Sequence, residues 1–419
     1  MQTIRVVGRR CHQLRLAAQR SASFLRPMAA ARDARPLHIL VIADRDWTHH
    51  DTGGNGANLY AQISRWVDWG HTVTVVAGDY PGAHGVERYG PRLVVHRMGT
   101  RVTVFPRAIL AVLRGIGRDA DVVLEVINGI TFLTPLWLRK PRVAMVHHVH
   151  RELYLEEFRR FGLPLFWMLE RLPLRLLYRR TPFLTISNSA RDDLAREGIP
   201  PEHVTVEYLG VDGEGFRPGT RAPEPHLIFV GRLKAYKNVE ALFDVLEALP
   251  DAILDVVGEG DHRPDLEAEI ARRGLGDRVR MHGYVDDRIK AELYSHAWVN
   301  LTASQSEGWS LTVIEAALCG TPSAALAIGG LAESIVDGET GFLARDTQEL
   351  AARVRELVED ADLRERLGAA AERRARTFTW DRSARAFLEV LWRVAGREPS
   401  PVLSSNGTAA AAGGTRTPA

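Results

Sequence analysis

Cysteine and long apolar runs are both scarce in this chain of 419 residues. Its two cysteines are Cys11 and Cys319, and the first lies in a tail-like segment, which excludes a disulfide scaffold and a cysteine-based zinc site. No apolar run approaches the ~20 residues of a membrane span. The chain also has no excess of one charge, because its 54 basic residues nearly balance its 52 acidic residues. That balance excludes a strongly basic nucleic-acid binder, so we expect no nucleic-acid partner.

Lysine is the rarest of the charged residues. The four lysines are Lys140, Lys234, Lys237 and Lys290, and the other basic residues are arginines. We attribute this bias to coding composition and not to function. It still makes a lysine at a suggestive position more informative than an arginine.

The two ends of the chain have no hydrophobic periodicity. Residues 1–36 form a basic extension that we expect to be disordered, with translation from Met28 or a transit peptide as alternatives. Residues 396–419 are rich in Gly, Ala, Ser, Thr and Pro, and we expect a disordered tail. No secretory pattern is present, so we predict a cytoplasmic protein, with a position at the inner face of the membrane as the alternative.

Between these ends, short apolar strands alternate with amphipathic helices, which predicts an α/β fold with parallel sheets covered on both faces. The alternation breaks at the Gly- and Pro-rich stretch 210–219 and then restarts. We therefore expect two doubly wound, Rossmann-like domains. The predicted segments are 37–212 for the N-terminal domain, 213–380 for the C-terminal domain and 381–395 for a terminal helix.

Glycines lie at the predicted start of the first helix, in the sequence Asp51-Thr-Gly-Gly-Asn-Gly56. At a helix N-terminus, Gly53 and Gly54 let backbone N–H groups approach a phosphate, and the helix dipole favours the anion. A simple turn is the alternative. The spacing is not the Gly-x-Gly-x-x-Gly pattern of dinucleotide-binding enzymes, which disfavours an oxidoreductase.

Two further motifs follow predicted strands of the second domain. Arg232 and Lys237 come after the strand 227–230, where ligands bind in such sheets, and an Arg fork with a Lys point charge suits a diphosphate. Glu307 and Glu315 flank the start of a predicted helix at 311–318, with Ser310 as its N-cap. We interpret these carboxylates as acceptors for hydroxyls at opposite ends of an extended ligand. The alternatives are a pair of solvated surface cations for the first motif, and two surface glutamates near a helix start for the second.

Two features of the first domain allow more than one interpretation. His148 and His150 end the predicted strand 143–149; the spacing to other ligands argues against zinc, so we predict no metal site and a polar contact to substrate instead. Residues 158–180 hold six arginines and one acid, Glu170, among apolar side chains. This stretch suits either an anionic membrane surface or a helix packed on its own domain.

These motifs, in this order, resemble the retaining family-4 glycosyltransferases of GT-B fold, over about residues 37–395. The resemblance is strongest for the Glu-x7-Glu motif that continues as Glu-Ala-Ala-Leu-Cys-Gly-Thr-Pro322, and for Gly-Arg-Leu-x-x-x-Lys at 231–237. It also includes Gly329-Gly-Leu-Ala-Glu333, the histidines up to His150 and Ser187-Asn-Ser189. The implied fold has two Rossmann-like domains that face a central cleft, with the terminal helix crossing back to the first.

The resemblance also implies roles for residues. Arg232 and Lys237 would hold the donor diphosphate, and Glu307 and His150 would contact the donor sugar at the reacting centre. Donor binding would further involve the following residues: Gly53, Gly54, Gly283, Gly308, Trp309, Ser310, Leu311 and Glu315. Two residues depart from the common pattern, Asn238 in place of glycine and Arg151 in place of aspartate.

The implied activity is the transfer of a hexosyl or N-acetylhexosaminyl group from a nucleotide-diphosphate sugar to a hydroxyl acceptor, with retention and without a metal or other cofactor. A nucleotide-sugar epimerase of the same architecture, a nucleotide-sugar binding protein and a peripheral-membrane enzyme with a lipid-linked acceptor are the alternatives. The predicted partners are the nucleotide sugar, an unidentified hydroxyl acceptor and, through 158–180, a membrane.

Overall fold

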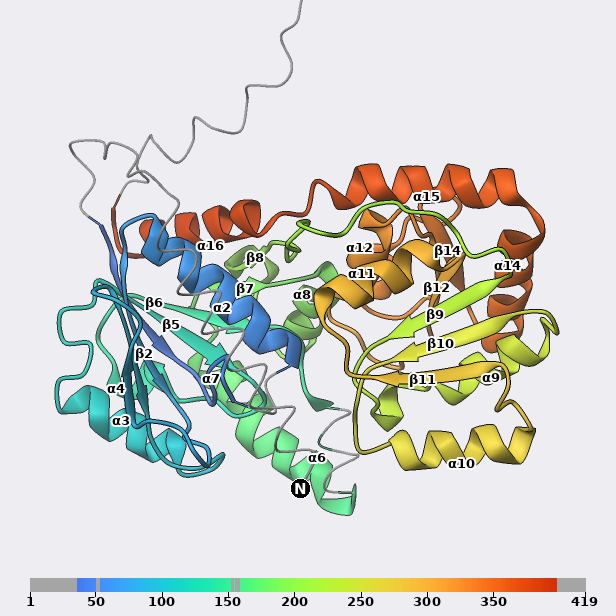
Figure 1. The fold of residues 1–419 in the computed structure, drawn as a ribbon. Coiled ribbons are helices and arrows are strands. Elements are labelled where there is room, and N and C mark those ends of the chain that lie inside the picture. Colours follow the sequence, from blue (N-terminus) through green and yellow to red (C-terminus); the bar gives the residue numbers. More distant parts are fainter. Residues whose placement is uncertain (1–35, 50–52, 152–153, 155–158, 398–419) are drawn as a thin grey trace, which may run out of the picture. The chain divides into compact units, whose positions relative to one another are not determined.

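The computed structural model describes residues 36–49, 53–151, 154 and 159–397 (Figure 1). The predictions for the extension 1–35, for Asp51 and for the tail 398–419 lie outside the described residues. The chain packs as two compact units. The first runs to Met145 and adds His150–Leu184 and the residues from Ala384 onward, and the second contains Val146–Val149 and Thr185–Ser383. The domain boundaries expected along the sequence stay predictions.

The first sheet has the strand order β3-β4-β2-β1-β5-β6-β7-β8. Its strands are β1 (His38–Ile42), β2 (Thr72–Ala77), β3 (Val86–Arg88), β4 (Leu93–Arg97), β5 (Val122–Ile127), β6 (Arg142–Val146), β7 (Phe183–Thr185) and β8 (Val204–Val206). Its helices are α2 (Gly53–Asp68), α3 (Val104–Leu113), α4 (Thr134–Trp137), α6 (Gly162–Phe166), α7 (Leu172–Leu177) and α8 (Asn188–Arg196), with a π-helix at Trp167–Arg171.

The second sheet has the order β11-β10-β9-β12-β13-β14. Its strands are β9 (His226–Val230), β10 (Ile253–Val257), β11 (Val279–Gly283), β12 (Val299–Thr302), β13 (Ser323–Leu326) and β14 (Gly341–Ala344). Its helices are α9 (Glu240–Glu247), α10 (Arg263–Arg273), α11 (Asp287–His296), α12 (Leu311–Leu318), α13 (Leu331–Ser334), α14 (Thr347–Glu359) and α15 (Ala361–Ala375); α16 (Trp380–Val394) follows.

Both sheets are built outward from a first strand that lies next to the fourth parallel strand. In the second sheet this switch in strand order falls between β9 and β12, and in the first it falls between β1 and β5. The order is that of a Rossmann-like doubly wound fold, in which ligands bind beyond the carboxyl ends of the strands at the switch. The prediction of parallel sheets is confirmed. Only β3, which pairs antiparallel with β4, departs from it among the strand pairs with an assigned register.

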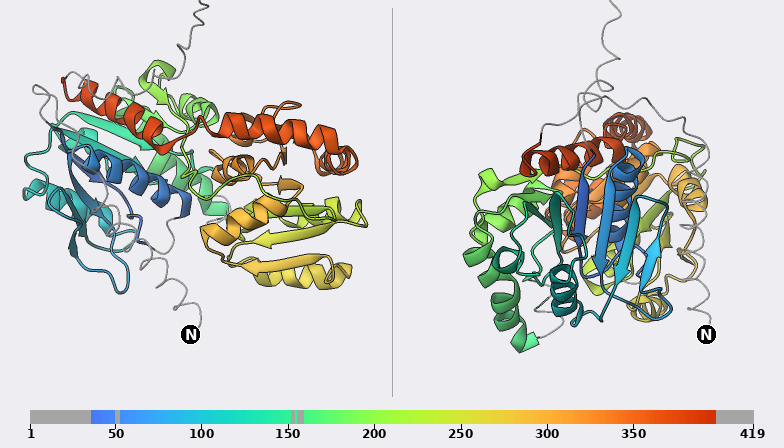
Figure 2. Two further views of the ribbon diagram at one scale, coloured as in Figure 1. Left: turned by 45° about the horizontal axis from the view of Figure 1, so that its top comes forward. Right: turned by 90° about the vertical axis from the view of Figure 1, so that its left-hand side faces the viewer.

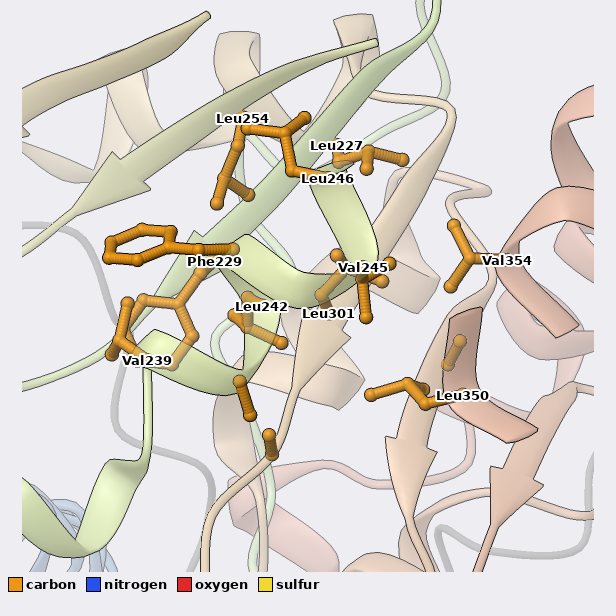
Figure 3. Close-up of a cluster of buried hydrophobic side chains, with 14 of the residues drawn as sticks. Leu227, Phe229, Val239, Leu242, Val245, Leu246, Leu254, Leu301, Leu350 and Val354 are labelled. Carbon is orange, nitrogen blue, oxygen red and sulfur yellow. The ribbon is translucent and has the colours of Figure 1, made fainter. Parts of the chain in front are cut away.

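The second unit has one large apolar core between its sheet and helices α9 and α14 (Figure 3). Phe229 of β9 and Leu301 of β12 lie under Leu242 and Leu246 of α9, all of them buried. Strands that are apolar on both faces, such as β9, can only be stable when helices cover both faces, which explains the alternation in the sequence. This packing fixes the carboxyl ends of β9 and β12.

The helix α16 packs within the first unit from Ala384 onward. The indole Nε1 of Trp66 in α2 donates a 2.9 Å hydrogen bond to the carbonyl oxygen of Ala384, and the rings of His71 and Trp392 lie 5.6 Å apart. The two helices meet near the carboxyl end of α2 (Figures 1 and 2). The apolar periodicity at the end of the chain therefore reflects a helix face that is buried against α2.

Candidate functional site

The charged motifs of the second unit lie at its topological switch. Gly231 to Lys237 follow β9 directly, and the loop that carries Glu307 leads from β12 to α12. Because β9 and β12 are neighbours in a parallel sheet, their following loops emerge at the same edge. The fold thus places the two motifs together although 70 residues separate Lys237 from Glu307.

Lys237 and Glu307 form an ion pair, with 2.7 Å between the lysine Nζ and the glutamate Oε2. Their side chains are 14% and 16% exposed. Burial alone disfavours the charged lysine, but the Glu307 carboxylate outweighs it and raises the pKa of Lys237 above its ordinary value. Lys237 is therefore a fixed positive charge at neutral pH.

Arg232 stands beside this pair with its guanidinium exposed. Among the described residues it has no hydrogen-bonded or ion-paired partner for its side chain, although its charge acts on Lys237. A guanidinium without an internal carboxylate keeps its planar set of donors available for a phosphate. Arg232 and Lys237 together supply two positive charges at the end of β9.

The backbone conformation at Asn238 explains why asparagine can replace the glycine of the family pattern there. Its φ of +49° lies in the left-handed region, directly after the 3₁₀ turn Ala235–Lys237. Glycine adopts this conformation without strain, and asparagine is the side chain that tolerates it best. The loop therefore keeps the shape that a glycine would allow, which holds Lys237 in place.

We expect Asn238→Gly to leave the free energy of unfolding within about 0.5 kcal/mol of the wild type, and Asn238→Val to lower it by about 1–2 kcal/mol. The reason is that a β-branched residue is strained at this φ. Urea denaturation of the two variants measures both values. Equal stability of the two variants would contradict the assigned backbone conformation.

The N-terminus of α12 leaves its donors open. Ser310 occupies the predicted N-cap position, but its hydroxyl makes no capping hydrogen bond and lies 3.1 Å from the hydroxyl of Thr312. The first turn contains no acidic residue. An uncapped helix start with its positive dipole end is suited to an anion.

The backbone before α12 is held by a pair of glycines. The amide of Gly330 donates a 2.6 Å hydrogen bond to the carbonyl oxygen of Glu307, and a Cβ on Gly330 would lie 2.1 Å from the carbonyl oxygen of Gly308. Trp309 is buried and stacks on Tyr208 with 4.4 Å between ring centroids. The indole thus anchors the loop that leads into α12.

Glu315 has a lysine partner of its own. Its Oε1 accepts a 2.9 Å hydrogen bond from Lys290 of α11, and its Oε2 is a buried atom without a hydrogen-bond partner among the described residues. Burial raises the pKa of Glu315, and the nearby Lys290 ammonium opposes that shift. The buried hydroxyl of Tyr294 acts on the same carboxylate and also opposes the shift. Lys290 was not predicted as a site residue. The scarcity of lysine in the chain was a signal that could have identified it.

Glu333 forms hydrogen bonds with the motif Ser187-Asn-Ser189 of the second unit. Its carboxylate accepts hydrogen bonds from the backbone amides of Asn188 and Ser189 at 2.8 and 2.7 Å, and from the hydroxyl of Tyr208 at 2.9 Å. A carboxylate at the N-terminus of α8 is favourable with the helix dipole. The two motifs noted separately in the sequence, 187–189 and 329–333, are therefore one structural contact.

Gly283 ends β11 with a φ of +69°. A Cβ there would lie 2.7 Å from the Oε1 of Glu259, and its carbonyl accepts a hydrogen bond from Gly258. The loops after β9, β10 and β11 are thus closely packed at the same edge. The predicted contact of Gly283 with a nucleotide base stays a prediction.

In the first unit, His150 belongs to a polar network at the carboxyl ends of β1, β5 and β6. Its Nε2 lies 2.9 Å from the Oδ1 of Asn128, and the Nδ2 of Asn128 donates to Asp44 at 3.2 Å. The fully buried Glu170 lies 3.3 Å from the backbone amide of His150 and 3.4 Å from its Nδ1. Both ring nitrogens therefore have a partner, which fixes the orientation of the imidazole.

Glu170 reaches His150 from the π-helix Trp167–Arg171. Pro173 follows it and lacks the backbone N–H that an α-helix would use here, which is a local reason for the wider turn. Sequence reasoning noted Glu170 only as the single acid among arginines. Asn128 gave no sequence signal at all, because its role depends on the neighbouring strands.

We expect Glu170→Gln to lower the turnover of the reaction proposed below about tenfold while leaving the affinity for a nucleoside diphosphate unchanged. The amide keeps the size of the side chain but removes the charge beside His150. Steady-state kinetics across pH 6–9, together with calorimetric binding, separate the two effects. A drop in nucleotide affinity equal to the drop in turnover would contradict a role through His150.

The remaining sites predicted in the first unit are only partly described. Helix α2 begins at Gly53, and a Cβ added at Gly54 would meet no atom within 4 Å. The glycines are thus the first turn of the helix and not a loop before it. The strand that was expected at 143–149 ends at Val146, so the histidines after it lie in an irregular segment. His147 is buried and His148 is half-buried.

The described residues lack two features that would indicate a metal site or a membrane span. No three His, Cys, Asp or Glu side chains in the described ranges come together in a way that could hold a metal ion. None of the helices described is both long and apolar enough to cross a membrane. That the protein requires no cofactor stays a prediction, and so does its cellular location.

Comparison with known families covers most of the structured chain. Residues 52–214 match the model "Glycosyltransferase Family 4", and residues 214–374 match "Glycosyl transferases group 1". A D-inositol 3-phosphate glycosyltransferase from Xylanimonas cellulosilytica is 35% identical over 233 residues, which are 50% of this chain and 56% of that protein. The chain thus spans about half the length of the curated relatives it matches.

Solved structures with similar folds match along nearly their whole length. The sucrose-phosphate synthase from Thermosynechococcus elongatus has a TM-score of 0.70 at 21% identity and covers 85% of this chain and 98% of its own. HepE from Anabaena, in complex with UDP-glucose, has a TM-score of 0.68 at 20% identity and covers 85% and 100%. With the two Rossmann-like sheets and both family matches, the chain belongs to the group 1 glycosyltransferases of family 4 type, with the GT-B fold.

Proposed function

We propose that the protein transfers a hexosyl or N-acetylhexosaminyl group from a nucleotide-diphosphate sugar to a hydroxyl acceptor, with retention at the anomeric carbon. The observation that carries this proposal is the arrangement at the end of β9. There the guanidinium of Arg232, which has no partner within the described ranges, lies beside Lys237, whose Nζ is 2.7 Å from the Oε2 of Glu307. Two cations next to a carboxylate suit a ligand with a diphosphate at one end and hydroxyls at the other.

Catalysis would depend on stabilising the departing diphosphate. Negative charge builds up on the phosphate oxygens as the glycosidic bond breaks, and fixed positive charges aimed at them lower the barrier. Arg232, Lys237 and the uncapped start of α12 would supply that charge, so no metal is required. Glu307 would accept hydroxyls of the sugar, and Glu315 would accept a hydroxyl of the ribose.

Retention is proposed on the family resemblance together with the absence of an evident carboxylate nucleophile. The acceptor would attack from the side of the leaving group, and the departing phosphate would take the acceptor's proton. His150, held by Asn128 and Glu170, would contact the sugar near the reacting carbon. Its tight network makes it an orienting group whose position does not depend on the ligand.

The test is a donor screen followed by product analysis. Thermal shift with UDP-, GDP- and ADP-sugars selects a donor, and UDP-glucose is the first candidate because the fold-related HepE structure contains it. Incubation with that donor and a panel of alcohol and sugar-phosphate acceptors is then followed by NMR. An α-linked product from an α-donor, formed equally well in EDTA, supports the proposal. A donor whose sugar is epimerised without any acceptor would instead identify the epimerase, and an inverted product would refute retention.

A further inference from the structure

The helical run over residues 162–177, together with the flanking turns out to Arg160 and Arg180, has two different faces. It contains α6, the π-helix Trp167–Arg171 and α7, drawn in green in Figure 1. Buried residues recur at every fourth position, at Gly162, Phe166, Glu170, Leu174 and Tyr178. The periodicity shows that one face is packed into the first unit, so the segment is a fixed part of the fold.

The opposite face exposes large apolar side chains. Phe161 is 59% exposed, Trp167 is 52% and Leu176 is 69%, and Leu163 and Met168 are exposed with them. Five of the eleven large apolar side chains that are exposed in the described part of the chain lie in this one segment. Such a concentration is unusual for a surface that only faces water.

Charge on the same face is of one sign. Arg160, Arg175, Arg179 and Arg180 are exposed, and the guanidinium of Arg160 lies 4.9 Å from the ring centroid of Phe161. The only acid of the segment, Glu170, is fully buried on the other face, where it contacts His150. The exposed face therefore combines apolar side chains with arginines and carries no negative charge.

We propose that this face docks on an anionic lipid surface, with the helix lying in the plane of the interface. Aromatic and aliphatic side chains would enter the boundary between headgroups and acyl chains, and the arginines would pair with lipid phosphates. The exposed arginines favour an anionic lipid surface over a neutral one, because their positive charge is opposite to that of the lipid phosphates. The inference concerns binding alone, so it stands apart from the proposed sugar transfer.

The test is co-sedimentation of the full chain with vesicles of phosphatidylcholine, with or without 30% phosphatidylglycerol. We expect binding only to the anionic vesicles, and weakening at 0.5 M salt. Each arginine near such a surface strengthens binding about fivefold, so Arg175→Glu/Arg180→Glu is expected to weaken it at least tenfold. Trp167→Ser/Leu176→Ser is expected to weaken it similarly through the lost apolar contacts.

Matched controls separate this face from general effects. Arg280→Glu/Arg366→Glu makes the same charge change on the second unit and is expected to change binding less than twofold. Leu110→Ser/Leu113→Ser removes exposed apolar side chains from α3 and is likewise expected to retain binding. Circular dichroism and thermal melting check that every variant is folded.

Several outcomes would overturn the proposal. These are no sedimentation with anionic vesicles, equal binding to both vesicle types, or a loss in the control variants as large as in the test variants. If the wild type forms a dimer in light scattering and Trp167→Ser/Leu176→Ser makes it monomeric, with no vesicle binding, the face is covered by a second copy of the chain. If the protein fails to bind anionic vesicles but still transfers sugar to a soluble acceptor, membrane docking is refuted and the proposed activity is unaffected.

Discussion

Replacing Lys237 with methionine is expected to lower the rate of sugar transfer about 10²–10³-fold, the usual effect of removing one group that stabilises a developing negative charge. Lys237 keeps its proton throughout the neutral range because Glu307 raises its pKa. The variant loses that charge and also leaves Glu307 without its ion-pair partner. Single-turnover kinetics with saturating donor measures the chemical step directly.

Lys234 is a matched control for this variant because it is a lysine of the same loop. It pairs with Asp261 at 2.8 Å, and both side chains are largely exposed. Such a surface pair contributes little, so Lys234→Met is expected to change the rate less than about threefold. Lys237→Arg is expected to recover part of the activity by restoring the charge. A Lys237→Met rate equal to that of Lys234→Met would contradict the role of Lys237.

Replacing Lys290 with methionine is expected to weaken nucleotide binding about 10- to 100-fold at pH 7, because it removes the charge that keeps the buried Glu315 ionised. Burial then raises the pKa of Glu315 further. A protonated carboxyl is a weaker acceptor for a ribose hydroxyl than a carboxylate. Calorimetric titration with a nucleoside diphosphate at several pH values measures the effect.

The same variant is expected to show opposite pH trends in binding and stability. The Glu315 carboxyl binds its proton more tightly in the folded protein than in the unfolded one, so stability is highest at low pH and is lost as pH rises through the raised pKa. Nucleotide affinity requires the ionised form and rises through the same pKa. Lys290→Arg is the control: it keeps the opposing positive charge, so both trends are expected to be weaker and to occur at lower pH than in Lys290→Met. Affinity and melting temperature that change in the same direction would indicate a purely structural role.

Hydrophobic pattern was sufficient to predict most of the fold. The helix predicted at 311–318 is α12 with those bounds, and the strand predicted at 227–230 is β9 with one more residue, because an apolar run between turn residues is a local signal. β3 and β14 were not predicted. β3 has exposed Val86 and Arg88 and depends on pairing with β4, and β14 starts with glycine, so neither has an apolar run of its own.

The candidate site was predicted only where its residues form a short motif. The pairing of Lys237 with Glu307 follows from the strand ends at which both motifs lie, and the sequence placed them there. Lys290 and Glu315 come from two helices that pack together, and Asn128, Glu170 and His150 come from three separate elements. Such contacts depend on tertiary packing, which a pattern along one strand or helix does not encode.

The central claim is that the second unit binds a nucleoside diphosphate through Arg232 and Lys237. Isothermal titration of the wild type and of Arg232→Ala/Lys237→Ala with UDP, GDP and ADP in EDTA tests it most directly. The account predicts binding of at least one of the three by the wild type, and a loss of about 100-fold or more in the double variant. No binding of any of them to the folded wild type, or equal affinity of the variant, would contradict the account.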